Sequence, residues 1–107
     1  MMLERIYADF AWEQAAALLA IDSPTGYTKN AACWVKEAFE TLGFSASITV
    51  KGGVLVDLGG KDETDALLLE AHADTLGAMV AQVKGNGRLR LTSLGGFIKE
   101  RHNSRQL

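Results

Sequence analysis

The 107-residue sequence has one cysteine, one proline and two histidines. A single cysteine, Cys33, cannot form an intrachain disulfide, which is typical of proteins from a reducing compartment, so we expect a cytoplasmic protein. The apolar neighbours of Cys33 indicate that it packs in a core and does not act as a nucleophile.

Long apolar runs and an excess of basic charge are also missing. No stretch approaches the roughly 20 apolar residues that cross a bilayer. Residues 1–10 contain Glu4, Arg5 and Asp9, where a signal peptide would be apolar. The formal net charge of −2 does not favour binding to nucleic acid or to an anionic membrane. We therefore expect a soluble protein whose partners include neither nucleic acid nor a membrane.

The first part of the chain has helical spacing. Residues 3–20 are rich in Ala and Leu, with apolar side chains three or four positions apart. Pro24 and Gly26 end this helix. A second helix is predicted from Thr28, as its N-cap, to Gly43, which suits the left-handed position after a helix. Because each helix has one apolar face, each is expected to pack on a sheet.

The spacing then changes to that of strands. Residues 44–50 alternate apolar and polar side chains, and Gly52-Gly53 predicts a hairpin into residues 54–58. Residues 66–71 are almost all apolar, as in an interior strand covered on both faces.

A second hairpin is predicted at Gly85-Asn86-Gly87, with Leu89 and Leu91 facing the core. The order of elements predicts an α/β fold with two N-terminal helices packed on a mixed β-sheet.

Residues 67–77, with the sequence LLLEAHADTLG, carry the candidate site. Ligands of open α/β sheets bind beyond the carboxyl ends of the strands, and His72 follows the predicted interior strand. A neutral imidazole is a good zinc or cobalt ligand, and a nearby carboxylate can fix its ring and raise its basicity. We therefore predict His72 as a metal ligand and Asp74 as a catalytic residue that orients it. By itself this two-residue pattern is more often structural.

The flanking sequence favours the metal site. Residues 71–80, the Gly-Asn-Gly hairpin and Leu94-Gly95-Gly96 together resemble the M42 family of metallo-aminopeptidases. Residues 23–27 (SPTGY) look like the loop before the second helix of that family, and the Gly52-Gly53 hairpin is similar to the strands before its His-x-Asp. The resemblance runs from about residue 10 to Gly96. We therefore expect residues 1–96 to be the N-terminal part of a peptidase catalytic domain, and residues 97–107 to be an irregular tail that departs from the family.

The resemblance implies the first part of a zinc-peptidase (phosphorylase/hydrolase-like) catalytic domain with a two-metal site of zinc or cobalt. It also implies a peptide substrate, cleaved at its N-terminal peptide bond by metal-activated water. His72 matches the first ligand of the family, and Asp74 matches the acid that orients this ligand. The other ligands and the general base have no counterpart here, and His102, in the tail, is not expected to be a ligand. A catalytic zinc needs about three protein ligands, so we expect the chain alone to be inactive and to bind no metal tightly.

A non-catalytic module is the alternative. An unfinished sheet exposes an edge strand, which favours pairing with another copy or with a separate C-terminal fragment. With either function we expect a homo-oligomer.

Overall fold

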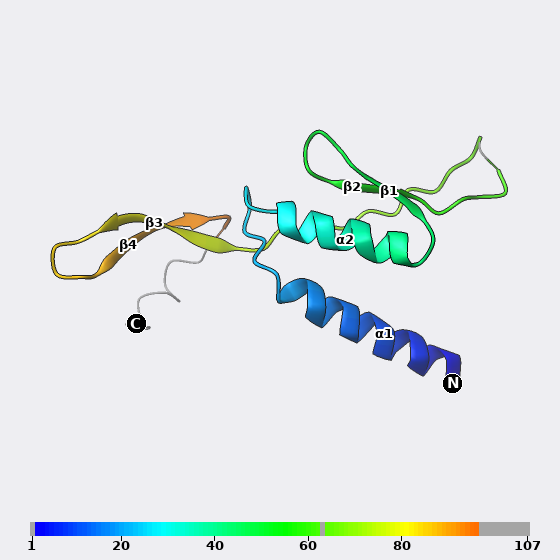
Figure 1. Ribbon diagram of the computed structural model, residues 1–107, viewed down its shortest axis with the longest axis horizontal. Coiled ribbons are helices and arrows are strands. Elements are labelled where there is room, and N and C mark those ends of the chain that lie inside the picture. The colour runs from blue at the N-terminus through cyan, green and yellow to red at the C-terminus, as the bar shows by residue number, and fades with distance from the viewer. Residues whose placement is uncertain (1, 63, 97–107) are drawn as a thin grey trace.

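The computed structural model of the chain describes residues 2–62 and 64–96. Its elements, in chain order, are α1 (Met2–Leu19), α2 (Lys29–Thr41), β1 (Ser45–Ile48), β2 (Val54–Asp57), β3 (Gly77–Val83) and β4 (Leu89–Leu94) (Figure 1). Both predicted helices and both predicted hairpins are present, so the fold is a mixture of α and β structure. No helix in the described part of the chain has the length and apolar character of a membrane span.

The C-terminus of α2 is closed by a Schellman motif. Gly43 has a φ of 91°, and its N–H donates to the carbonyl of Glu40 at 2.9 Å, while the Phe44 N–H donates to the carbonyl of Phe39 at 3.1 Å. The rings of Phe39 and Phe44 meet edge to face, with centroids 6.4 Å apart. This apolar contact across the end of the helix accompanies the motif in many proteins. The role predicted for Gly43 is confirmed.

The N-terminus of α2 differs from the prediction in one respect. Thr28 occupies the N-cap position, but its side chain makes no capping hydrogen bond. Its backbone, with φ −108° and ψ 0°, is not in the extended region from which an N-cap hydroxyl reaches the free N–H groups of the first turn.

The β1–β2 hairpin provides the surface on which α2 packs (Figure 1). The two strands are antiparallel, from Ser45 opposite Asp57 to Ile48 opposite Val54. Its turn contains Gly52 at a φ of 85°. Within residues 2–62 and 64–96, the buried apolar residues are Ala31 and Ala32, both on α2; Cys33 beside them is half-buried.

The prediction of one mixed sheet is wrong for the residues that the structure describes. The four strands form two separate antiparallel pairs, β1–β2 and β3–β4. Residues 66–71, predicted as the interior strand that would join them, form no strand. Leu67, Leu68 and Leu69 are 84%, 73% and 76% exposed. An interior strand needs a hydrogen-bonded neighbour along each edge, and none of the described strands pairs with this segment.

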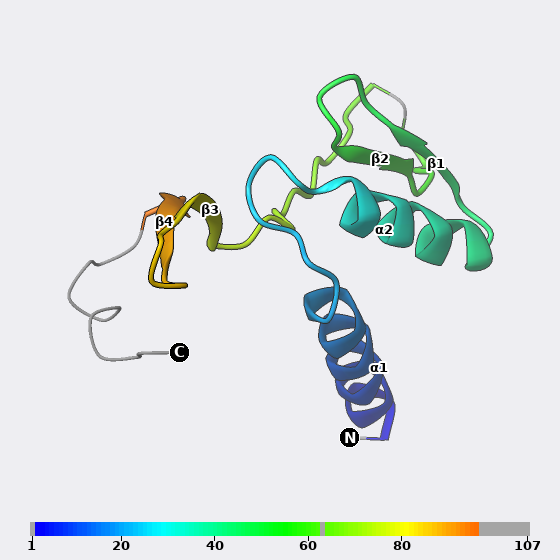
Figure 2. The same cartoon turned by 60° about the vertical axis from the view of Figure 1, so that its left-hand side comes forward.

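Two further packing predictions are wrong, because in the described residues neither α1 nor the β3–β4 hairpin packs on a common sheet. α1 contacts α2 but no strand, and none of its residues is buried. The β3–β4 hairpin contacts no other described element, so Leu89 and Leu91 are exposed and do not face a core. Figure 2 shows α1 and β3–β4 extending away from α2 and its hairpin. The radius of gyration is 18.8 Å, against about 13 Å for a compact domain of this length.

Candidate functional site

The candidate site lies where the loop between α1 and α2 meets the segment that leads into β3. Pro24 and Thr75 form an isolated parallel β-bridge. The Thr75 N–H donates to the Ser23 carbonyl at 2.8 Å, and the Thr25 N–H donates to the Thr75 carbonyl at 3.3 Å. These bonds hold two loops that are distant in the sequence side by side.

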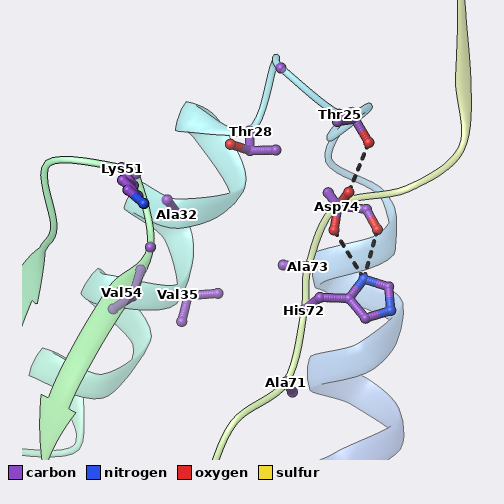
Figure 3. A pocket seen from close by; sticks show the side chains of 13 residues that line it. Thr25, Thr28, Ala32, Val35, Lys51, Val54, Ala71, His72, Ala73 and Asp74 are labelled. Carbon is purple, nitrogen blue, oxygen red and sulfur yellow. Dashed lines mark hydrogen bonds and ion pairs between the residues drawn. The ribbon is translucent and has the colours of Figure 1, made fainter. Parts of the chain in front are cut away.

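His72 and Asp74 are in direct contact on the second of these loops (Figure 3). The Nδ1 atom of His72 lies 3.1 Å from Asp74 Oδ1 and 3.1 Å from the Asp74 carbonyl oxygen. An ionised carboxylate and a carbonyl only accept hydrogen bonds, so the Nδ1–H is the donor and the lone pair of the neutral ring is on Nε2. The His72 side chain is 86% exposed, which leaves Nε2 accessible.

The second carboxylate oxygen of Asp74 is also bonded. The Thr25 hydroxyl donates to Asp74 Oδ2 at 2.8 Å. This hydrogen bond is the main cause that lowers the pKa of Asp74 below its ordinary 3.8; the hydrogen bond and charge of His72 lower the pKa further, and partial desolvation opposes both. Asp74 is therefore ionised at neutral pH, with each oxygen held by a different donor.

The structure thus brings together the two residues predicted from the sequence and adds Thr25. From the sequence, residues 23–27 resemble a family loop, and no role is predicted for Thr25. Nothing in its local spacing indicated one, because Thr25 and Asp74 are 49 positions apart. The roles of His72 as a metal ligand and of Asp74 as a catalytic residue stay predictions.

An open pocket of about 420 Å³ adjoins the site. Its lining combines the loop before α2, the first turns of α2, the β1–β2 turn with Lys51, and residues 71–74. In Figure 3 the His72 ring points away from α2 and Lys51. Among the residues that the structure describes, no group of three or more His, Cys, Asp or Glu side chains is placed to hold a metal ion. This part of the chain therefore offers one oriented imidazole, that of His72, to a metal ion.

Comparison with known proteins supplies the family. A family model described as M42 glutamyl aminopeptidase matches residues 52–107. The chain belongs to the M42 family. The resemblance predicted from the sequence is confirmed, and the matched range includes His72 and Asp74. It also runs through residues 97–107, which lie outside the described residues, so the predicted domain boundary at Gly96 stays a prediction.

Two curated relatives match most of the chain. The "Putative aminopeptidase YhfE" of Bacillus subtilis is 38% identical over 87 residues, which cover 81% of this chain and 24% of the relative. The glutamyl aminopeptidase of Lactococcus lactis is 28% identical over 87 residues, which cover 80% of this chain and 24% of that protein. The chain thus spans about a quarter of the length of the curated relatives it matches.

Proposed function

We propose that this M42 chain supplies the first metal ligand, His72, and the carboxylate that orients it, Asp74, to an aminopeptidase site. The reaction is hydrolysis of the N-terminal peptide bond of a peptide by metal-activated water. Support comes from the family, from two relatives named as aminopeptidases, and from one observation in the structure. That observation is the contact of His72 Nδ1 with two acceptor oxygens of Asp74, which favours a proton on Nδ1 and a free lone pair on Nε2 of a ring that is 86% exposed.

The chemistry of this donor fits a zinc or cobalt ion. A histidine ligand usually donates its other N–H to a carboxylate or carbonyl, which fixes its tautomer and raises its basicity, and Asp74 provides both acceptors. When bound, the metal lowers the pKa of its water and polarises the substrate carbonyl. We propose that the elements around His72 form the first part of a phosphorylase/hydrolase-like zinc-peptidase domain.

The chain by itself is proposed to be catalytically incomplete. A catalytic zinc site uses about three protein ligands, and no group of three or more His, Cys, Asp or Glu side chains in residues 2–62 and 64–96 is placed to hold a metal ion.

Cobalt titration of the histidine-labelled chain tests this function. The paramagnetic ion is expected to broaden the ring signals of His72 first, with weak binding that disappears in His72→Ala and persists in His102→Ala. Broadening that spares His72 contradicts its role as a ligand. Tight stoichiometric binding, or hydrolysis of an aminoacyl anilide by the pure chain, contradicts incompleteness and implies ligands shared between chains.

The proposed reaction takes place in the cytoplasm, on a peptide with a free N-terminus. The single cysteine supports this location, because the chain makes no intrachain disulfide. Recovery of the chain only in a membrane or secreted fraction of the source cells would contradict it.

A second candidate function is association without catalysis, which the three exposed leucines of residues 67–69 favour. Extended, apolar and unpaired segments promote pairing with another chain. The partner is proposed to be a second copy, giving a homo-oligomer, with a separate C-terminal fragment as the other outcome. Sedimentation of the pure chain at several concentrations tests for the homo-oligomer. A monomer at every concentration contradicts self-association.

A further inference from the structure

The orientation of His72 depends on a carboxylate that is itself anchored from elsewhere. His72 and Asp74 are two positions apart, so their contacts do not tie the ring to the rest of the fold. Thr25 ties the pair to the rest of the fold, because its hydroxyl donates to Asp74 Oδ2 from the loop before α2 (Figure 3). The Asp74 side chain is 42% exposed, so a carboxylate without this donor is free to turn toward water.

We propose that Thr25 is a positioning residue: its hydroxyl fixes the Asp74 carboxylate so that Oδ1 accepts the Nδ1–H of His72 and Nε2 keeps its lone pair. This inference rests on the proposed function of His72 as a metal ligand. The atoms form a chain in which Thr25 Oγ1 lies 2.8 Å from Asp74 Oδ2 and Asp74 Oδ1 lies 3.1 Å from His72 Nδ1.

The hydroxyl of Thr25 is separable from the backbone that holds its loop. The bonds between Thr75 and the backbone of Ser23 and Thr25 do not involve side chains, so they persist when the hydroxyl is removed. Valine has nearly the same shape as threonine and shares its restricted χ1 angle. Thr25→Val therefore removes one donor, and Thr25→Ser keeps it.

The effect of the lost hydroxyl is expected to be partial. The Nδ1–H of His72 also donates to the Asp74 carbonyl, which no change at residue 25 removes. The loss of a single hydrogen bond of ordinary strength changes an equilibrium about fivefold. Thr25→Val is therefore expected to lower the ratio of the Nδ1–H to the Nε2–H tautomer about twofold to fivefold.

The test is nitrogen NMR of the full chain with ¹⁵N-labelled histidine, at a pH where the rings are neutral. The shifts of the two ring nitrogens give the tautomer ratio of His72, and a His102→Gln variant assigns the two histidines. The wild type is expected to be mainly Nδ1–H, with a lower ratio in Thr25→Val and recovery in Thr25→Ser. Thr25→Ala and Thr25→Ser form a second pair that lacks the γ-methyl group and again differs only in the hydroxyl.

Several results would overturn the inference. These are a wild-type ring that is mainly Nε2–H, an unchanged ratio in Thr25→Val, or a serine variant that behaves like alanine. Loss of Thr75 amide protection in both hydroxyl-free variants, but in neither hydroxyl-bearing one, would assign Thr25 a structural role instead.

The same samples separate this inference from the proposed function. If the tautomer ratio follows the hydroxyl but cobalt never reaches His72, Thr25 positions the ring and the metal function fails. If cobalt broadens His72 equally in all variants and the ratio is constant, the metal function stands and the role of Thr25 fails.

Discussion

Pro24 and Gly77 touch where the loop before α2 meets the start of β3. A Cβ atom built on Gly77 would lie 2.5 Å from Cβ of Pro24, a distance at which one of the two backbones must move. Glycine at residue 77 therefore permits the bridge between Pro24 and Thr75 and, through it, the approach of Thr25 to Asp74.

Gly77→Ala is expected to separate the two loops. The overlap with Pro24 should lower the free energy of unfolding by about 1–3 kcal/mol, the usual cost of forcing extra volume into a packed contact. Urea unfolding gives the stability, and hydrogen exchange of the Thr75 amide reports the bridge. Gly85→Ala is the control, because nothing lies within 4 Å of a Cβ atom at that turn position. Equal stability and equal Thr75 protection in the two variants would contradict the importance of the contact.

The stability of the C-terminal end of α2 is expected to depend on glycine at residue 43. Because Gly43 has a φ of 91°, alanine there is strained, and Gly43→Ala should lower the free energy of unfolding by about 1 kcal/mol. The loss of helix is expected to be confined to the last turn of α2, beside Phe39 and Phe44. Circular dichroism during urea unfolding measures the change. Gly60→Ala, where the new Cβ atom makes only ordinary contacts, should leave the midpoint in place.

The helices and hairpins could be predicted from the sequence because local residues determine them. Gly43 ends α2 through hydrogen bonds to the residues just before it, and Gly52 and Gly87 close their turns at positive φ. The position of His72 beside Asp74 also follows from a separation of two residues. Each of these features needs only residues that are neighbours in the chain.

The tertiary arrangement could not be predicted in the same way. The apolar residues 66–71 have the composition of an interior strand, but a strand becomes interior only when neighbours pair with both edges, and composition does not supply them. Thr25 was missed because its partner is 49 positions away. A hydroxyl that bonds at such a distance leaves no periodic pattern in the sequence.

The lowered pKa of Asp74 predicts how stability depends on pH. The folded pKa is below the ordinary 3.8, so the stabilising contribution of this carboxylate is fully present above about pH 4. It is lost as the pH falls from 3.8 through the folded pKa, because the unfolded chain takes up the proton first. Carboxyl ¹³C NMR should show the midpoint of Asp74 below 3.8 in the wild type.

The contribution of Thr25 to that pKa can be isolated. Thr25→Val removes the largest cause of the shift, so the midpoint of Asp74 should move up toward 3.8. Asp62 is an internal control, because its pKa is lowered mainly by the side chain of Thr64 and should not respond to residue 25. A midpoint of Asp74 that is the same in both proteins would show that the hydroxyl does not bond to it in solution.

Self-association is expected to occur through the exposed leucines of residues 67–69. Burial of one leucine contributes roughly 1.5–3 kcal/mol, so Leu68→Lys should weaken a dimer that buries this side chain by about tenfold to a hundredfold. Sedimentation equilibrium over a range of concentrations gives the dissociation constant. Val50→Lys adds the same charge at an exposed position in the β1–β2 turn and should associate like the wild type. If both changes raise the dissociation constant equally, the added charge and not the lost leucine weakens association. If neither change alters the dissociation constant, the interface lies away from residues 67–69.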